Sequence, residues 1–372
     1  MKKVLIVLDN CNMGGIVTSL YSLLSKIDNK IVIIDVFVRD YSGPLLYQLP
    51  NCTLLPENLW LSHNIHNSGF LVKILNFILL CVRKIFEKIG VDMFSVYNYI
   101  GGKQLSTEEY DAVIGFSESL SRYISALPAR KRIIWIHCDY RRYANGIDES
   151  KYYNKIDRIV CVSEFAKKVF TGYYSKYFDK TLFIHNIINE DDLRMKSLAP
   201  IKDTRFVHDC FTIVSCGRFD SVKQFQLIPS IVDRVRAITD KPFKWYIIGD
   251  GASDVKRQIQ LEIERYDVSN YVCCLGLKTN PYPYMAKADL YVCTSMSESY
   301  PMVVNEAKAL YVPVLCNTFP SATESVNNGI DGCILEIEKM PLAIAGMIIN
   351  PMKIVKSQSE NDTILNQFYS LL

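Results

Sequence analysis

The sequence predicts an α/β protein made of two doubly wound, parallel-sheet domains that face each other across a cleft. Short apolar runs recur without polar alternation, helix-length stretches separate them, and 372 residues exceed the size of one ordinary core. In such folds ligands bind outside the carboxyl ends of the strands, where we expect the functional residues. The predicted strands are Val4–Leu8, Ile31–Val38, Ala112–Ile114, Ile133–Ile136, Ile159–Val162, Thr212–Ser215, Trp245–Ile248, Leu290–Cys293 and Val314–Cys316.

The domain boundaries follow from one interruption of this pattern. Between residues 189 and 209 the sequence becomes polar and contains Pro200, and a new apolar run begins at Phe211. The resulting segments are a first domain at 1–190, a linker at 191–209, a second domain at 210–352 and a terminal helix at about 353–372 that packs back on the first domain.

Composition and charge exclude several classes of protein. Apolar residues make up 49% of the chain and charged residues 22%, which is typical of a folded protein and excludes a disordered one. The net charge of +3 is too small for a nucleic-acid-binding protein, although the positive excess lies in residues 1–200 and could favour an anionic membrane. The 12 cysteines form no Cys-x-x-Cys pair, and the first apolar run is too short for a signal peptide. We therefore expect free thiols in a cytoplasmic protein.

One helix-length segment combines apolar and basic residues in an unusual way. Phe70–Ile89 is strongly apolar but carries Lys73, Arg83, Lys84 and Lys88. These charges interrupt the apolar part too often for a bilayer span. Two interpretations are open: a core helix, or an interfacial helix whose basic residues lie at the headgroups of an anionic membrane.

The most informative group of candidate site residues lies between residues 245 and 307. A strand ends in Gly249-Asp250-Gly251, and the string NPYPYMAKADLYVCTS at 280–295 leads to Glu298 and Glu306. The second glutamate lies on a helix that we expect to begin near residues 301–303, and the free backbone N–H groups of that helix start can bind a phosphate. Two glutamates at this spacing are weak evidence by themselves, because a solvated helix face has the same pattern.

Taken together, these motifs resemble the retaining glycosyltransferases of family 4, which have the GT-B fold of two Rossmann-like domains. Glu298 and Glu306 match the family's Glu-x(7)-Glu element, and the preceding string is similar to the family's approach to it. The resemblance covers nearly the whole chain and is strongest over 211–335. It implies that Glu298 holds the donor sugar and Glu306 the ribose. The segment between them is expected to add donor contacts from Tyr300, Pro301, Met302 and Val303.

A second match follows the first strand of the second domain. Gly217, Arg218 and Lys223 are similar to the family's Gly-Arg…Lys element. A leaving nucleoside diphosphate gains negative charge, and an Arg with a Lys can stabilise that charge without a metal. The alternative is that Arg218 is an ordinary surface cation. The chain has no Asp-x-Asp pair, the usual metal clamp of the other major glycosyltransferase fold, so we expect no metal and no cofactor.

The candidate residues of the first domain follow its strands. Gly14-Gly15 matches the family's diglycine and would let the backbone approach a ligand, although a plain tight turn has the same sequence. The missing Gly-x-Gly-x-x-Gly spacing argues against a nicotinamide-dependent oxidoreductase. His137 stands in a string similar to the family's Ile-His-x-Asp-Tyr, which implies contact with the donor sugar or reaction centre; a structural histidine is the alternative. Ser163 is expected to cap a helix.

The resemblance implies transfer of a hexose, with retention of configuration, from a nucleotide diphosphate-sugar to a glycan or lipid-linked acceptor in surface polysaccharide (capsule) biosynthesis. UDP is favoured over GDP on family frequency alone. The expected catalytic residues are His137, Arg218, Lys223 and Glu298, and the expected donor contacts include Gly15 and Gly217. The first domain would bind the acceptor, at the inner face of the cell membrane if the interfacial interpretation holds. Two alternatives stay open: a nucleotide-sugar epimerase of the same fold, and a non-catalytic nucleotide-sugar-binding partner of a transferase complex.

Overall fold

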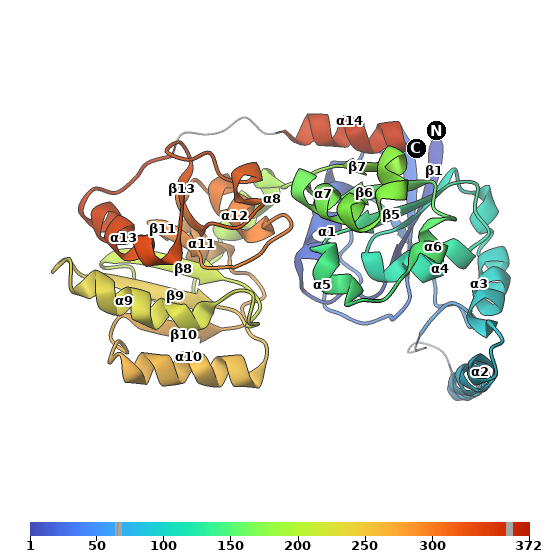
Figure 1. Ribbon diagram of the computed structural model, residues 1–372, viewed down its shortest axis with the longest axis horizontal. Helices are drawn as coiled ribbons and strands as arrows, with labels where there is room; N and C mark the ends of the chain where they lie inside the picture. Colours follow the sequence, from blue (N-terminus) through green and yellow to red (C-terminus); the bar gives the residue numbers. More distant parts are fainter. Residues whose placement is uncertain (64, 66–68, 355–359) are drawn as a thin grey trace. The chain divides into compact units, whose positions relative to one another are not determined.

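The computed structural model describes residues 1–63, 65, 69–354 and 360–372, which form two compact units (Figure 1). The first unit comprises Met1–Ile187 together with Glu360–Leu372, and the second comprises Ile188–Ser359. Each unit contains its own parallel sheet covered by helices. Two doubly wound domains are the predicted fold class, and that prediction is confirmed.

In the described part of the first unit, seven parallel strands form a sheet in the order β3-β2-β1-β4-β5-β6-β7. The order reverses between β1 and β4, so the carboxyl ends of these strands flank the switch point at which α/β sheets bind ligands. The strands are β1 (Lys2–Leu8), β2 (Val32–Val38), β3 (Thr53–Leu54), β4 (Ala112–Gly115), β5 (Arg132–Ile136), β6 (Arg158–Cys161) and β7 (Thr181–Phe183).

Helices cover this sheet and bury its central strands on both faces. The five residues Val4–Leu8 of β1 are each at most 1% exposed, as the unalternating apolar sequence predicts. The Ser163 hydroxyl accepts a hydrogen bond from the Ala166 amide at 3.0 Å and caps the next helix, which confirms its predicted role. The helices are α1 (Gly15–Lys26), α2 (Phe70–Lys88), α3 (Met93–Gln104), α4 (Ser121–Ala126), α5 (Tyr140–Ala144), α6 (Ser150–Tyr153), α7 (Glu164–Tyr173) and α14 (Asn361–Leu371).

The terminal helix α14 belongs to the first unit although it follows the second in sequence. The Phe368 ring lies 6.2 Å from the Trp135 ring, centroid to centroid, and the Asp28 amide donates a hydrogen bond to the Tyr369 hydroxyl at 2.9 Å. Phe368 is 1% exposed, so its burial gives the hydrophobic contribution that holds α14 on this unit.

Across residues 188–354, six parallel strands form the second sheet in the order β10-β9-β8-β11-β12-β13. Its order reverses between β8 and β11. The strands are β8 (Phe211–Cys216), β9 (Phe243–Ile248), β10 (Val272–Gly276), β11 (Leu290–Cys293), β12 (Val314–Asn317) and β13 (Gly332–Leu335). The helices are α8 (Glu190–Ser197), α9 (Ile228–Arg236), α10 (Ser253–Arg265), α11 (Tyr282–Ala286), α12 (Met302–Ala309) and α13 (Met340–Ile349).

The segment 191–209, which is predicted to be a linker, is packed into the second unit. Leu193 of α8 is 5% exposed and belongs to the core that contains Tyr284 and Met285. The Phe206 ring lies 4.6 Å from the Tyr246 ring. The polar sequence here reflects a helix with a single buried face, because one apolar residue per turn is enough to dock a short helix.

Helix α2 is exposed and is not a core helix. Among its residues only Asn76 is buried, whereas Phe70, Leu71, Phe77 and Ile85 are 77%, 79%, 67% and 60% exposed. Figure 1 shows α2 beside α3 at the periphery of the first unit. The core-helix interpretation is therefore wrong. In the described residues, no helix combines the length and apolarity that a membrane span requires.

Two loops at the carboxyl edge of the second sheet approach each other very closely. The Gly217 amide donates to the Ile248 carbonyl at 3.0 Å, and the Phe219 amide donates to the Asp250 carbonyl at 2.9 Å. Gly249 has a φ of +149°, and a Cβ added there would lie 1.9 Å from the Gly217 carbonyl oxygen. Only glycine fits this position, which fixes the loop after β8 against the loop after β9.

We predict that Gly249→Ala lowers the melting temperature by several degrees, equivalent to more than about 2 kcal/mol, because one of the two backbones must move. Gly346→Ala is the matched control: it lies in α13, where an added Cβ meets nothing within 4 Å. That change should leave the melting temperature unchanged or raise it, since alanine favours helix. Thermal unfolding followed by circular dichroism measures both. Equal melting temperatures for Gly249→Ala and the wild type would contradict the close approach.

Candidate functional site

The candidate site of the second unit lies at the carboxyl ends of β8 and β11. These strands are neighbours at the point where the strand order reverses. The loop after β8 carries Gly217, Arg218 and Lys223, and the loop after β11 carries Glu298. Residues far apart in the sequence thus meet at the switch point of the sheet, as parallel topology requires.

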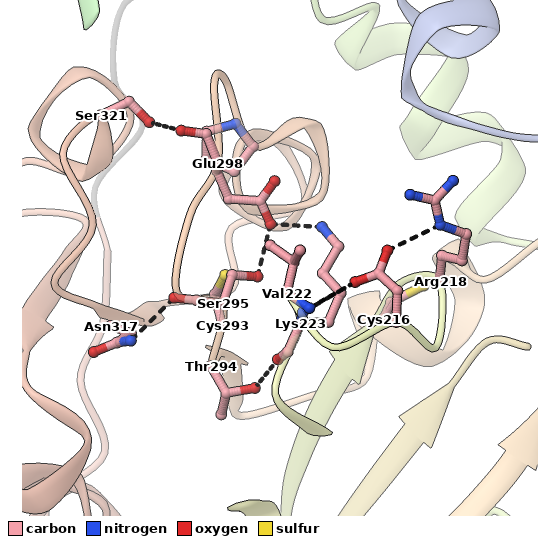
Figure 2. Close-up of polar contacts among 12 residues, drawn as sticks. Cys216, Arg218, Val222, Lys223, Cys293, Thr294, Ser295, Glu298, Asn317 and Ser321 are labelled. Atoms are coloured by element: carbon pink, nitrogen blue, oxygen red, sulfur yellow. Dashed lines mark hydrogen bonds and ion pairs between the residues drawn. The ribbon is translucent and has the colours of Figure 1, made fainter. Parts of the chain in front are cut away.

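Lys223 and Glu298 form a largely buried ion pair. Lys223 Nζ lies 2.5 Å from Glu298 Oε1, and their side chains are 19% and 14% exposed (Figure 2). The Ser295 hydroxyl donates to the same oxygen at 2.7 Å. Burial by itself lowers the pKa of Lys223, but the nearby Glu298 carboxylate outweighs that effect, so the pKa of Lys223 is raised. Lys223 is therefore charged at neutral pH.

The second carboxylate oxygen of Glu298 remains available to a ligand. Oε1 accepts both hydrogen bonds, from Lys223 and from Ser295, whereas Oε2 has no hydrogen-bond partner among the residues that the structure describes. A carboxylate oxygen fixed in this way can accept a hydrogen bond from a ligand hydroxyl. Because Lys223 and Ser295 already orient the carboxylate, such a contact needs little further ordering.

Several supporting side chains hold the backbone of both loops. The Thr294 hydroxyl donates to the Lys223 carbonyl at 2.6 Å, and the Ser321 hydroxyl donates to the Glu298 carbonyl at 2.6 Å (Figure 2). Asn317 Nδ2 donates to the Ser295 carbonyl at 3.0 Å. None of these residues is a predicted site residue. Asn317 ends β12, the neighbour of β11, and Ser321 lies in the loop after it. Polar residues that follow β12 are the sequence feature that could have indicated this supporting role.

Arg218 lies on the same loop but points to solvent. Its side chain is 80% exposed, and its Nε donates to Asp220 Oδ2 at 2.9 Å. Asp220 Oδ1 accepts hydrogen bonds from the amides of Val222 and Lys223 at 3.1 and 3.2 Å. Asp220 therefore ties the position of Arg218 to the backbone that carries Lys223.

Glu306 lies on α12, which begins after Tyr300 and Pro301 with Met302 and Val303 in its first turn. Glu306 is 5% exposed, and the Tyr282 hydroxyl donates to its Oε1 at 3.3 Å. Burial raises the pKa of Glu306 to about 7. A buried carboxyl group with so few partners is suited to accept hydrogen bonds from ligand hydroxyls.

The remaining predicted residues, Gly15 and His137, belong to the first unit. Gly15 begins α1, and His137 follows β5. The His137 amide donates to Glu118 Oε2 at 2.9 Å, and its ring lies 4.9 Å from the Phe116 ring. Burial lowers the pKa of His137 to about 3, so its ring is neutral at physiological pH. Among the described residues its Nε2 is buried without a hydrogen-bond partner.

Among the residues that the structure describes, no three His, Cys, Asp or Glu side chains are grouped so that they could hold a metal ion.

Several known glycosyltransferases are similar in sequence to this chain. Residues 210–352 match the family described as Glycosyl transferases group 1. Over 340 residues the chain is 24% identical to a Campylobacter jejuni enzyme, N-acetylgalactosamine-N,N'-diacetylbacillosaminyl-diphospho-undecaprenol 4-alpha-N-acetylgalactosaminyltransferase, and this covers 91% of the chain and 87% of that enzyme. It is 28% identical over 177 residues to an uncharacterised glycosyltransferase of Methanocaldococcus jannaschii, covering 45% of the chain and 42% of that relative.

The fold agrees with these matches. Anabaena HepE in complex with UDP and glucose superposes with a TM-score of 0.70 at 15% identity, covering 99% of the chain and 98% of HepE. The molecule has the two Rossmann-like domains of the GT-B fold. The chain thus has the GT-B fold, and its residues 210–352, called the group 1 domain below, match a glycosyltransferase family.

We predict a pH dependence of stability that comes from Glu306. Its pKa is about 7 in the folded protein and near its ordinary value of 4.5 in the unfolded chain. The stability that the neutral carboxyl contributes is therefore complete below about pH 4.5 and lost as the pH rises through 7. Glu306→Gln stays neutral, so between pH 4.5 and 7 it should keep on the order of 3 kcal/mol of stability that the wild type loses.

Thermal unfolding of both proteins across this pH range measures the difference. Glu338→Gln removes an exposed carboxylate of the same unit and should follow the wild type at every pH. A Glu306→Gln variant that is less stable than the wild type at pH 8 would show that the ionised carboxylate is required by the fold.

Proposed function

We propose that this protein is a retaining, metal-independent glycosyltransferase of family 4. It would act in the cytoplasm and transfer a hexose from a UDP-sugar to a glycan or lipid-linked acceptor of surface polysaccharide. The observation that carries the proposal is the buried Lys223–Glu298 pair at the switch point of the group 1 domain. It places a cation and an available carboxylate oxygen side by side, which suits the phosphate and the sugar hydroxyls of one donor.

The donor would lie along the carboxyl edge of the second sheet. Glu306 would accept hydrogen bonds from the ribose, and the free backbone N–H groups at the start of α12 would meet the diphosphate. Lys223 and Arg218 would flank the same diphosphate. Glu298 Oε2 would accept a hydrogen bond from a hydroxyl of the transferred sugar.

Transfer would proceed on one face of the sugar. The acceptor hydroxyl attacks the anomeric carbon on the face from which the diphosphate departs, and the departing phosphate oxygen takes the proton. Lys223 and Arg218 stabilise the negative charge that develops on this leaving group. The neutral ring of His137 would donate or accept a hydrogen bond near the sugar, because its low pKa excludes a role as a cation.

Two of the similar proteins support the choice of substrates. HepE was solved with UDP and glucose, which supports UDP as the nucleotide. The Campylobacter enzyme is named for a diphospho-undecaprenol acceptor, which supports a lipid-linked acceptor. Product analysis of the reaction identifies the sugar and the linkage.

Helix α2 supports association with a membrane surface. Its apolar side chains are exposed, and Lys73, Lys84 and Lys88 lie exposed on the same helix. Such a helix can insert its apolar side chains between headgroups while its lysines contact anionic lipids. A lipid-linked acceptor would be reached at that surface.

We predict that Lys223→Ala and Arg218→Ala each slow sugar transfer by roughly 10²- to 10³-fold, because each removes a charge that stabilises the leaving group. Lys287→Ala, an exposed lysine of the same unit, should leave the rate unchanged. Activity with a UDP-sugar and acceptor should persist in EDTA. A strict requirement for Mg²⁺ or Mn²⁺ would contradict the metal-free site, and a new sugar without transfer would identify an epimerase.

We also predict salt-sensitive binding to anionic vesicles and none to neutral vesicles. Each Lys near an anionic surface contributes about 1 kcal/mol, so the triple change of Lys73, Lys84 and Lys88 to Glu should abolish sedimentation with vesicles. Nucleotide binding should be unaffected. Wild-type protein that stays in the supernatant with anionic vesicles at low salt would show that α2 does not bind membranes.

A further inference from the structure

Tyr282 of α11 contacts the carboxyl group of Glu306 on α12. The Tyr282 hydroxyl donates a hydrogen bond to Glu306 Oε1 at 3.3 Å. In the described residues, Glu306 Oε2 accepts no hydrogen bond, and it is not among the polar atoms that protein atoms enclose completely. One oxygen of this carboxyl group is therefore held by the protein, and a ligand can reach the other.

The start of α11 fixes the place of Tyr282. Asn280 Oδ1 accepts a hydrogen bond from the Tyr282 amide at 3.2 Å, and Asn280 Nδ2 donates to the Lys196 carbonyl of α8 at 2.8 Å. Pro281, the residue before the helix, has its φ restricted by its ring, so it suits a helix start. Asn280 thus ties the first turn of α11 to α8, and the Tyr282 ring has a defined base from which to reach Glu306.

The Tyr282 hydroxyl is a permanent donor. Burial, and then the Glu306 carboxylate, raise the pKa of Tyr282, so the hydroxyl stays protonated at physiological pH. Two other ionisable groups near Glu306 are Cys216 of β8, whose pKa burial raises to about 12, and Lys196, which pairs with Asp192 at 2.6 Å. Burial raises the pKa of Glu306, and the Tyr282 hydrogen bond, followed by the attraction of Lys196, acts against that rise. Tyr282 therefore stabilises the ionised form of Glu306.

A hydrogen bond to one oxygen also orients the carboxylate. The terminal torsion of a glutamate side chain has a broad distribution, so a carboxylate without a partner rotates freely. Glu298 has the same arrangement, since its Oε1 accepts the hydrogen bonds of Lys223 and Ser295 while its Oε2 is available. The Tyr282 bond is longer than the usual O–H···O distance of about 2.7 Å, and hydrogen bonds of a site are often long until the ligand binds.

We propose that Tyr282 is a positioning residue for nucleotide binding, which holds Glu306 Oε1 so that Oε2 accepts a hydrogen bond from a ribose hydroxyl. This inference rests on the proposed function, because that function gives Glu306 the ribose. An ionised carboxylate is a stronger acceptor for a hydroxyl than a neutral carboxyl group. Tyr282 thus contributes to binding through both the orientation and the charge of Glu306.

Titration calorimetry with UDP and with 2′,3′-dideoxy-UDP, which lacks both ribose hydroxyls, tests this role. Tyr282→Phe should weaken UDP binding by about five- to tenfold, on the scale of one hydrogen bond to a charged group. Its affinity for the dideoxy nucleotide should stay within about twofold of the wild type. Tyr284→Phe is the matched control, because it removes a hydroxyl from the same helix, where the ring packs against Phe206. The control should bind both nucleotides like the wild type.

The pH dependence of UDP binding gives a second measurement. Because the Tyr282 hydrogen bond lowers the pKa of Glu306, its removal should raise that pKa above the wild-type value of about 7. The UDP affinity of the wild type should increase as Glu306 ionises, and the midpoint of this increase should lie at a higher pH in Tyr282→Phe. Tyr284→Phe should keep the wild-type midpoint. A merely structural role of Tyr282 would leave the midpoint where it is.

An equal loss of affinity for UDP and for the dideoxy nucleotide in Tyr282→Phe would overturn the proposal, as would unchanged binding of UDP. In a Glu306→Ala background, Tyr282→Phe should cause no further loss, and a full further loss would also contradict it. Glu306→Ala alone separates the two levels of the account. If it binds UDP like the wild type, the ribose contact of the proposed function fails and this inference fails with it. If it weakens UDP binding and Tyr282→Phe does not, only the role of Tyr282 fails.

Discussion

Lys223 and Glu298 join the loops that follow β8 and β11, the two strands between which the second sheet reverses its order. Both side chains are largely buried, so each has lost much of its hydration. A buried ion pair of this kind contributes little net stability, because its attraction must offset the desolvation of two charges. What the pair does fix is geometry. With the hydrogen bonds from Thr294 and Ser321, it holds one cation and one carboxylate in place before any ligand arrives.

The sequence pattern predicted the interior of both sheets and missed their edges. The nine predicted strands correspond to β1, β2, β4, β5, β6, β8, β9, β11 and β12, and the four missed strands, β3, β7, β10 and β13, are the outermost strands of the two sheets. Interior strands are buried on both faces and therefore have continuous apolar sequences. Edge strands are partly exposed, as in β13, where only the first residue, Gly332, is buried. In addition, β3 and β7 have only two and three residues, which is too short for an apolar run to mark a strand.

The site itself was predictable to the extent that its residues form a motif. Arg218, Lys223, Glu298 and Glu306 were identified by spacing and resemblance, and the structure places all four in the second unit. Ser295, Asn317 and Ser321 act through backbone and carboxylate contacts that depend on the meeting of separate loops, which no local pattern records. The sequence also could not predict that α2 is exposed, because an apolar helix has the same composition whether it packs in a core or lies on a surface.

Calorimetry with UDP tests most directly the proposal that Glu298 and Glu306 contact different parts of one donor. Glu306→Ala should weaken UDP binding at least tenfold, because it removes the proposed ribose contact. Glu298→Ala should retain UDP affinity within about twofold and lower the rate of sugar transfer, because its carboxylate acts on the transferred sugar. Unchanged UDP affinity and unchanged transfer in both variants would contradict the assignment of the site.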